Sequence, residues 1–220
     1  MKLENFLKST LLPGVFFVSL INSCIKESYL TVSSDTTTIA KIYQPDGQFG
    51  KDAIIKSITP DQNYSGSDYL STFSWTNGGL FNHARTLIEF DLSDIVPQTK
   101  ISSAKLSLFM ISHDNLTGQT GDNAYGIFRI TQPWSESSVT WNNQPEISKL
   151  HKVSVAKSID PDQSYLNIDI TLIVQDIIDY PNESYGIMLK LDEEIPYKSV
   201  IVASSEYSQN AKRPKLVIFY

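Results

Sequence analysis

Apolar runs of strand length alternate with polar turn residues along most of the chain. The two richest runs cover 84–93 and 101–111, where apolar, β-branched and aromatic residues predominate. The polar bridge between them contains Pro97, and proline interrupts a strand because it lacks a backbone N–H. Asp91 and Ser93, at the end of the first run, can bond nearby backbone groups and turn the chain. These runs predict two adjacent core strands.

The same pattern predicts strands elsewhere in the chain. Short apolar runs, bounded by turn signals such as Pro-Asp-Gly and Asn-Gly-Gly, recur on both sides of the central pair. The predicted strands cover 41–43, 53–58, 70–75, 125–131, 153–156, 166–170, 185–191, 198–203 and 213–220. Because strands and helices do not alternate, we predict an all-β fold, a single antiparallel β-sandwich of the jelly-roll type over residues 41–220.

One short helix is predicted, over 171–180. Its apolar stripe consists of Leu172, Ile173 and Ile177. Thr171 is placed to cap the first turn, and Pro181 ends the helix because proline cannot continue it. A helix of this length is expected to cover one end of the sandwich.

Arg85 is the charged exception in the first core strand. Alternation places it on the same face as Leu87 and Glu89. It therefore lies on a partly wetted face of the sheet or is paired inside with an acid, of which Glu89 is one. The sequence leaves both arrangements open.

The first 23 residues have the pattern of a signal peptide. Lys2 and Lys8 precede an apolar run at 11–21, which is too short to cross a bilayer as a helix. Cys24 follows directly after a small residue, an arrangement that resembles a bacterial lipobox whose cysteine is lipidated. We therefore expect a signal peptide over 1–23 and a membrane anchor at Cys24.

Residues 24–40 are dominated by serine and threonine, which predicts a flexible tether between the anchor and the folded domain. Lys26 and Glu27 resemble the charged export signal of some Bacteroidetes-type lipoproteins. We expect an exported monomer that is anchored to the outer membrane and displayed at the cell surface.

The charge balance excludes nucleic acid as a partner. The 220-residue chain has a formal net charge of −6, and loss of Lys2, Lys8 and Glu4 with the leader, a net +1, makes it −7. Such a chain is repelled by a polyanion unless basic residues gather in one place. Cys24 is the one cysteine of the sequence, so no disulfide joins two parts of the chain and stability comes from the core.

Several motifs resemble those of one family. The stretch 85–93 reads Arg-Thr-Leu-Ile-Glu-Phe-Asp-Leu-Ser, and Ile-Ser-Ser-Ala-Lys-Leu-Ser-Leu follows from Ile101. The stretch 134–141 reads Trp-Ser-Glu-Ser-Ser-Val-Thr-Trp, and an Arg-Pro strand at 213–220 ends the sequence. These stretches resemble the DNRLRE domain family, which is classed with the family 96 carbohydrate-binding modules. The resemblance covers roughly 41–220.

The resemblance implies a non-catalytic module that binds a polysaccharide, neutral or acidic, as an accessory to separate enzymes. Two other functions remain open. One is a structural or adhesive surface protein that binds a protein or matrix partner, and the other is a polysaccharide lyase or hydrolase. Exposed rings on a shallow face favour glycan binding, a flat apolar patch favours a protein partner, and a deep cleft with paired carboxylates favours an enzyme.

Sugar binding requires a flat aromatic ring on which pyranose C–H groups can stack, with polar partners for the hydroxyls. Trp75 stands beside the turn 76–79 and has the least reason to be in the core, and Tyr64 in a polar loop is next. Packing is the alternative for each. Trp134 suits either a core anchor or a platform, whereas Trp141 is expected in the core.

The predicted ligand-binding residues are Trp75, Tyr64, Asn77, Arg85, Trp134 and Arg129. If the polysaccharide is acidic, Arg85 and Arg129, together with Lys105, would pair with its carboxylates. An internal ion pair is an equally good interpretation of Arg85.

No catalytic residues are predicted. His83, His113 and His151 stand in unrelated segments without the spacing of a metal site. Glu136 and Glu206 are the most tempting glycosidase pair, but a side chain that bonds backbone or arginine at a strand end is the favoured interpretation.

A structural calcium ion is the one cofactor considered, because jelly-roll modules often hold one through carboxylates and loop carbonyls. Asp46, Asp52 and the segment 121–123 could supply oxygen ligands, although their spacing is not that of an EF-hand. The favoured interpretation is that these residues form turns. No metal ligand is therefore predicted.

Overall fold

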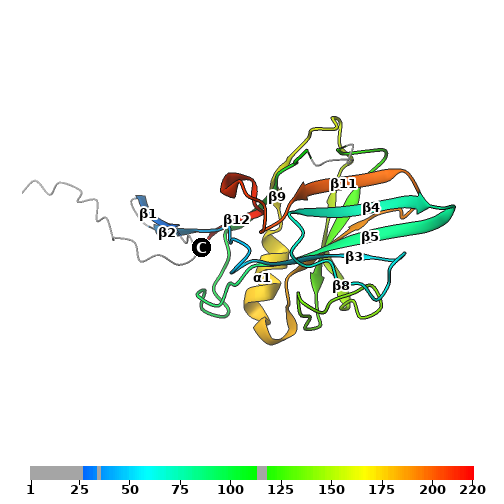
Figure 1. Cartoon of the computed structure of the whole chain (residues 1–220). Helices are drawn as coiled ribbons and strands as arrows, with labels where there is room; N and C mark the ends of the chain where they lie inside the picture. The colour runs from blue at the N-terminus through cyan, green and yellow to red at the C-terminus, as the bar shows by residue number, and fades with distance from the viewer. Residues whose placement is uncertain (1–26, 34–35, 113–117) are drawn as a thin grey trace, which may run out of the picture.

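The computed structural model describes residues 27–33, 36–112 and 118–220. It consists of two antiparallel sheets and one α-helix (Figure 1). The predicted signal peptide, Cys24 and His113 lie outside the described residues. Among the residues that the structure does describe, no helix is long and apolar enough to cross a membrane.

The first sheet has five strands in the order β1-β2-β12-β6-β9. These are β1 (Glu27–Ser33), β2 (Thr36–Tyr43), β12 (Lys215–Phe219), β6 (Ser103–Leu108) and β9 (Tyr165–Asp169). The last strand of the chain pairs with β2 on one side and β6 on the other. It therefore ties the beginning of the domain to its middle.

The second sheet has seven strands in the order β11-β4-β5-β10-β7-β8, with β3 paired to β5. These are β3 (Lys51–Lys56), β4 (Tyr69–Asn77), β5 (Leu80–Glu89), β7 (Tyr125–Ile130), β8 (Ile147–Val155), β10 (Ile187–Leu191) and β11 (Lys198–Ala203). Ala84 is the register partner of both Lys56 and Phe73. Because a strand residue has one neighbour on each side, β3 and β4 flank β5 from opposite edges.

The main core lies between the two sheets. Its members are aliphatic and aromatic side chains from both sheets, and they include Leu106, Leu108, Ile127 and Ile218, which are fully buried. Burial of one such side chain contributes about 1.5–3 kcal/mol. The prediction of an all-β sandwich is confirmed, and the two central runs form β5 and β6. The prediction that these two strands are adjacent is wrong, because the bridge that contains Pro97 takes the chain from one sheet to the other, and β5 and β6 belong to different sheets.

A second, smaller core covers the outer face of the seven-stranded sheet, under the loop 131–147. Its buried members are Ala53, Ile55, Leu87, Ile130, Trp134, Val139 and Met188. Asn63 holds this loop in place, because its side-chain amide donates to the carbonyls of Glu136 and Val139 at 2.7 and 2.8 Å. The loop therefore has a fixed position on the sheet.

The helix α1 (Thr171–Asp179) forms where it was predicted and is followed by a 3-10 turn η1 (Pro181–Glu183). It contacts β6 of one sheet and β7 and β8 of the other. Two details of the prediction are wrong. Thr171 does not cap the helix, because its hydroxyl accepts the Ala104 N–H. Leu172 is 58% exposed, whereas Ile173 faces the core as predicted, together with Val174 and Ile178.

The segment predicted as a flexible tether differs in the structure. Residues 27–33 and 36–43 pair as the antiparallel strands β1 and β2, with Glu27 opposite Ile42. The physical reason is that β-branched residues such as threonine favour extended backbone, and β2 also pairs with β12. The described sheet therefore extends into the range expected to be a tether.

The hairpin between β4 and β5 turns at Gly78 and Gly79, which have φ angles of 57° and 83°. Backbone in this region suits glycine because it has no Cβ. The hairpin projects from the end of the molecule opposite to the C-terminus and β1 (Figure 1). A second 3-10 turn, η2 (Asn210–Lys212), precedes β12.

Candidate functional site

A row of aromatic rings lies on the outer face of β5 beside the loop 131–147. Phe81 and His83 project from the same face of the strand, two residues apart, and Trp141 comes from the loop. The ring centroids are 6.1 Å apart for Phe81 and His83 and 6.5 Å apart for His83 and Trp141, with interplanar angles of 21° and 28°. We call Phe81, His83 and Trp141 the aromatic row.

The aromatic row is open to solvent at one end and closes onto the small core at the other. Phe81 is 65% exposed, and His83 and Trp141 are half-buried. Trp141 packs against the small core, in line with the core position expected for it, but it also presents a ring to the row. The row therefore offers a ring surface on a rigid strand.

Arg85 continues the aromatic row along β5 and stacks over Trp141, with its guanidinium carbon 4.5 Å from the ring centroid. Its Nε and Nη2 atoms both donate to the Glu194 carboxylate at 2.9 Å, and its Nη1 atom donates to Gln144 at 2.6 Å. Of the two arrangements left open by the sequence, Arg85 adopts an ion pair. Its partner is Glu194, whereas Glu89 pairs with Lys51.

The ion pair with Arg85 keeps the Glu194 carboxylate ionised. Burial raises its pKa, but the hydrogen bond and charge of Arg85, together with the charges of Lys190 and His83, outweigh burial and lower the pKa overall. The carboxylate lies beside the aromatic row, because its partner Arg85 stacks over Trp141. Rings, guanidinium and carboxylate therefore share one surface.

Trp75 is 37% exposed, as expected for a tryptophan next to a turn. Its ring meets that of Tyr197 edge to face, with centroids 5.1 Å apart. Asn77 is exposed at the end of β4, opposite Leu80. Trp75 and Asn77 therefore remain candidates for ligand contact at the tip of the β4–β5 hairpin.

Tyr64 is half-buried, and its ring is covered. The Lys56 ammonium lies 4.0 Å from the centre of the ring, and the phenol oxygen bonds Thr59 at 2.6 Å. Burial lowers the pKa of Lys56. The structure does not bring Tyr64 and Trp75 into ring contact, so a role for Tyr64 in ligand binding stays a prediction.

Trp134 and Arg129 have structural contacts. Trp134 is 9% exposed, donates its indole N–H to the Tyr185 carbonyl at 2.9 Å and lies under the Lys51 ammonium. Arg129 donates to the Glu183 carbonyl and to the Ser184 hydroxyl. Both side chains are away from the aromatic row in their contacts, and their roles in ligand binding stay predictions.

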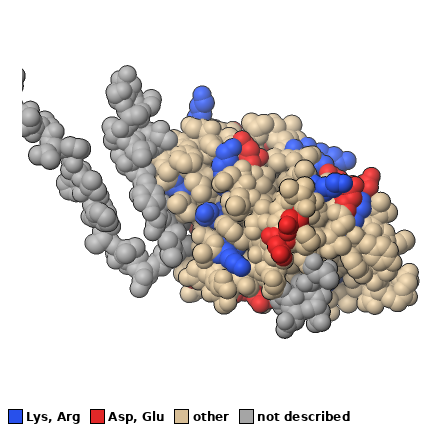
Figure 2. Space-filling model, turned by 90° about the horizontal axis from the view of Figure 1, so that it is seen from above, with Lys and Arg blue, Asp and Glu red and all other residues tan. Residues whose placement is uncertain are grey.

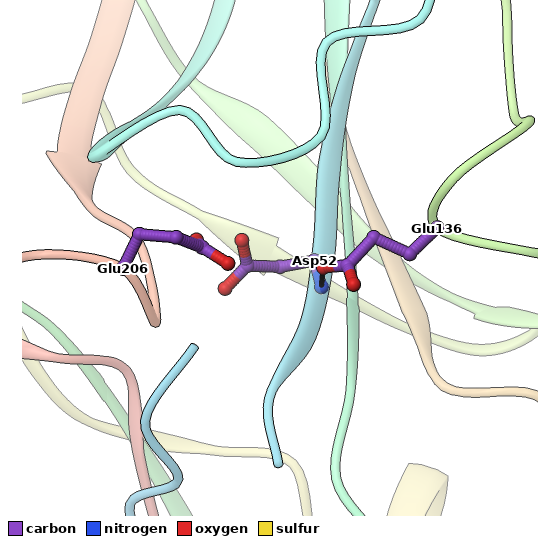
Figure 3. A group of neighbouring side chains, drawn as sticks. All are labelled: Asp52, Glu136 and Glu206. Atoms are coloured by element: carbon purple, nitrogen blue, oxygen red, sulfur yellow. Dashed lines mark hydrogen bonds between the residues drawn. The ribbon is translucent and has the colours of Figure 1, made fainter. Parts of the chain in front are cut away.

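A second polar group forms where three carboxylates meet: Asp52 of β3, Glu136 of the loop 131–147 and Glu206 after β11. One oxygen of each lies within 4.8 Å of the others. Figure 3 shows the Asp52 carboxylate pointing toward Glu206, with Glu136 bonded to the Asp52 backbone N–H at 2.9 Å. We call these three residues the carboxylate cluster.

Asp52 is the most perturbed member of the carboxylate cluster, because it is 3% exposed. Burial and the charges of Glu206 and Glu136 raise its pKa to about 8, although hydrogen bonds from Ser205 oppose the shift. Burial also raises the pKa of Glu136, and the Asp52 N–H opposes that shift. Burial therefore favours the protonated form of Asp52 at neutral pH.

Three carboxylate oxygens are the kind of ligands that a hard cation such as Ca²⁺ accepts. Of the calcium candidates in the sequence, Asp52 belongs to the carboxylate cluster. Asp46 instead accepts the backbone N–H groups of Gln48 and Phe49, and Asp122 lies 3.7 Å from Lys157. Asn123 is fully buried and donates to the Ser199 carbonyl, so these residues shape turns and packing.

Glu136 and Glu206, the tempting glycosidase pair, do come together, but with a third acid between them. Carboxylates of a retaining glycosidase stand about 5–5.5 Å apart on either side of a substrate cleft. A pocket of about 300 Å³ elsewhere is lined by His151, Lys152, Val153, Asp169, Thr171 and Leu172. None of the three acids lines that pocket.

Five members of the site were not predicted as ligand-binding residues: Phe81, His83, Trp141, Gln144 and Glu194. Phe81 and His83 could have been found, because they extend the alternation that placed Arg85 and Leu87 on one face. Glu194 could not, because 109 positions separate it from Arg85. Its position follows from the pairing of β10 with β5.

Comparison with curated proteins finds no match to this chain. The family model of carbohydrate-binding module family 96 matches residues 47–220, which is most of the chain and almost all of the sandwich. The match includes the aromatic row, Arg85 and the carboxylate cluster. The chain therefore belongs to carbohydrate-binding module family 96.

Proposed function

We propose that the protein binds a polysaccharide without cleaving it and that the ligand lies along the aromatic row. The observation that carries this proposal is that Phe81 and His83 of β5 and Trp141 of the adjoining loop form a row of rings next to Arg85 and Glu194. Membership of a carbohydrate-binding module family supports the same function.

The chemistry of the row suits a sugar chain. Pyranose C–H groups stack on aromatic faces, and planar polar side chains beside the rings bond the hydroxyls. Because Phe81 leaves one end of the row open to solvent, a sugar chain can reach the row from that end. Trp75 is the register partner of Asn82 and so lies on the other face of the hairpin from Phe81 and His83, which makes it a separate candidate contact.

The cellular setting is part of the proposal. A lipid at Cys24 would hold the protein at the outer membrane, where it would capture glycan at the cell surface as an accessory to separate enzymes. The arrangement in Figure 1 supports this setting, because β1 and the β4–β5 hairpin lie at opposite ends of the molecule. An anchor at the N-terminal end would leave the row facing outward.

The proposal is tested by affinity gel electrophoresis of wild type against a panel of polysaccharides. Phe81→Ala is expected to weaken retardation by about tenfold in Kd, since stacking on one ring contributes about 1 kcal/mol or more. Tyr180→Ala is the matched control, because Tyr180 is also an exposed aromatic at 55% and lies at the end of α1. Equal effects of both substitutions would contradict the proposal.

The alternative function is adhesion to a protein or matrix partner. It is favoured by apolar exposure around the same hairpin, since Leu80 is 65%, Ile195 is 53% and Tyr197 is 57% exposed. Retardation by no polysaccharide would favour this alternative. The third function, a lyase or hydrolase, would be revealed by reducing ends or unsaturated products in the same mixtures.

A further inference from the structure

We propose that a pocket between β8, β9 and α1 is a second binding site, which takes a single sugar residue. The pocket has a volume of about 300 Å³ and is lined by His151, Lys152, Val153, Asp169, Thr171 and Leu172. We call these six residues the edge pocket. The inference goes beyond the proposed function, because none of the six belongs to the aromatic row.

The edge pocket lies where the open sides of the two sheets meet. β8 is the last strand of the seven-stranded sheet, β9 is the last strand of the five-stranded sheet, and both strands line the pocket. The helix α1 begins beside this opening and contacts both sheets (Figure 1). The volume is at the lower end of the range for small-molecule sites. It therefore suits one sugar ring, at the end of a chain or on a branch.

A bulge in β8 shapes one wall of the edge pocket. Ile127 of β7 pairs with Val153, and Arg129 pairs with Ser148, so β8 leaves the regular register between these two pairs. His151 lies in the bulge and has a φ angle of 57°, in the left-handed region that histidine seldom adopts. Bulges re-aim side chains, and such backbone strain persists where the surrounding structure holds it. We attribute the position of His151 at the pocket to this bulge.

The imidazole of His151 is held by a buried acid. Asp176, which is 8% exposed, places its Oδ2 atom 2.9 Å from Nδ1 of His151, and Nε of Arg129 lies 3.8 Å from the same oxygen. Because a carboxylate accepts hydrogen bonds, Nδ1 is the donor, and Nε2 has no partner among the residues that the structure describes. The neutral ring of His151 therefore offers a positioned acceptor for a sugar hydroxyl.

Asp169 supplies a second fixed acceptor. Its Oδ2 atom accepts the Lys105 ammonium at 2.7 Å, and its Oδ1 atom accepts the N–H and hydroxyl of Thr171 at 3.0 and 2.6 Å. The bond from Lys105, together with those from Thr171, lowers the pKa of Asp169 to about 2, so the carboxylate is charged at neutral pH. The side chain is 62% exposed, and its remaining acceptor positions can receive sugar hydroxyls.

Leu172 and Val153 give the edge pocket an apolar wall. Leu172 is 58% exposed, although its neighbours Ile173 and Val174 on α1 are fully buried. A sugar ring has apolar C–H groups on its face and hydroxyl groups at its rim, so it needs apolar surface beside a few placed polar groups. The leucine and the two acceptors provide that combination.

The ammonium group of the pocket lysine is already paired. Lys152 lies 2.6 Å from the Asp192 carboxylate, as Lys105 does at 2.7 Å from Asp169. The face shown in Figure 2 likewise has basic and acidic side chains close together at several places. Lys152 therefore contributes its aliphatic stem to the wall of the pocket, and the hydrogen bonds to a sugar fall to His151 and Asp169.

The test titrates the full chain with single sugars and follows the imidazole signals of His151 by NMR. The probes are the methyl glycosides of glucose, galactose, mannose and glucuronic acid. His151→Asn assigns the signals through their loss, since asparagine tolerates a positive φ. At least one glycoside is expected to shift them with a Kd of about 1–10 mM, the affinity expected for so small a ligand.

Leu172→Ala is the decisive variant, because it removes the apolar wall while alanine keeps the helix. It is expected to weaken binding at least about threefold, since part of the apolar contact is lost. Leu150→Ala is the matched control. Leu150 is 60% exposed and lies next to His151 in β8, but it does not line the pocket, so its truncation should leave the Kd unchanged. Thermal unfolding checks that each variant is folded.

The inference is overturned if no glycoside shifts the His151 signals at about 100 mM, well above the expected Kd. Equal losses in Leu172→Ala and Leu150→Ala overturn it as well. If Leu172→Ala does not fold, His151→Asn decides, because saturation transfer to the glycoside should disappear in that variant and its persistence counts against the pocket.

Phe81→Ala separates the edge pocket from the proposed function. This variant should lose retardation by polysaccharide and keep the response of His151 to the glycoside. Loss of both responses would assign the sugar to the aromatic row and overturn the second site. Retardation of wild type by no polymer would contradict the proposed function, whereas a shift of His151 in the same protein would still support the edge pocket.

Discussion

Acids near the two ends of the loop 131–147 have pKa values shifted in opposite directions. At one end, Glu136 joins Asp52 and Glu206, and three carboxylates face one another. At the other end, Trp141 and Gln144 flank Arg85, which pairs with Glu194. The pKa of Asp52 is raised to about 8, whereas that of Glu194 is lowered.

The difference teaches that burial alone does not set the state of an acid in this protein. Asp52 is buried and Glu194 is half-buried, and burial raises the pKa of each. Only Glu194 has a guanidinium that outweighs this effect. At neutral pH Asp52 is therefore held mainly in its protonated form, and Glu194 keeps its charge.

The largest expected loss of stability comes from truncating a side chain of the small core, which lies under the loop 131–147. Trp134→Ala should cost about 3–5 kcal/mol, the usual cost of removing a large aromatic from a packed site. Urea unfolding measures it. Trp134→Phe is the control, since it keeps most of the packing and loses only the bond to the Tyr185 carbonyl. A loss of glycan binding in folded Trp134→Phe would instead make this residue part of the ligand site.

Glycine-to-alanine substitutions test how tightly the chain is packed near the carboxylate cluster and at the tip of the β4–β5 hairpin. A Cβ at Gly50 would clash with Cβ of Ser205, the residue whose N–H bonds Asp52. We therefore expect Gly50→Ala to cost about 1–3 kcal/mol through overpacking. Gly78, at the tip of the hairpin, has nothing within 4 Å of such a Cβ. Gly78→Ala should cost about 1 kcal/mol from its positive φ alone. Equal costs in thermal unfolding would contradict the comparison.

The carboxylate cluster should make stability depend on pH. A pKa raised in the folded state means that the folded chain holds a proton that the unfolded chain releases. Stability is therefore full below about pH 4, the ordinary pKa of Asp52, and falls until the pH passes its folded pKa of about 8. Asp52→Asn should flatten this fall, and above pH 8 it should be more stable than wild type.

Urea unfolding between pH 4 and pH 9 measures this dependence. The buffer contains a chelator, because a cation held by the carboxylates would oppose it. Glu89→Gln is the control, since Glu89 is an acid at the end of β5 with its own cation, Lys51. An Asp52→Asn variant with the same pH profile as wild type would show that Asp52 is ionised throughout.

The smallest loss of stability is expected at an exposed ion pair that belongs to neither the carboxylate cluster nor the aromatic row. Lys105→Ala should cost at most about 1 kcal/mol at neutral pH, since surface pairs contribute little. Bonds from Lys105 and Thr171 lower the pKa of Asp169 to about 2, so the contribution is present above about pH 4 and is lost as the pH falls toward 2. Thermal unfolding should show the difference from wild type shrinking over that range. A larger cost would give Lys105 a role in the core.

Local features of the fold followed from local sequence. The alternation in 84–93 identified β5, the stripe at 171–180 identified α1, and glycines at 78 and 79 identified the hairpin turn that exposes Trp75. Each depends on residues within a few positions of one another, where periodicity and turn chemistry act directly.

The partners of the charged residues did not follow in this way. Arg85 and Glu194 are 109 positions apart, Asp52 and Glu136 are 84 apart, and Asp52 and Ser205 are 153 apart. With many acids in the chain, no spacing selects the one that meets a given arginine. That choice depends on which strands become neighbours in the sheet.

By itself the sequence therefore determined an all-β sandwich, its one helix and the exposure of Trp75. Only the tertiary structure decided that Arg85 pairs with Glu194 and that Trp141 and His83 form a row with Phe81. It also decided that the three acids of the carboxylate cluster meet. The physical reason is that side-chain periodicity is a property of a single strand. Charge pairing and ring contact are instead set by strand order and by the loop that crosses the outer face of the sheet.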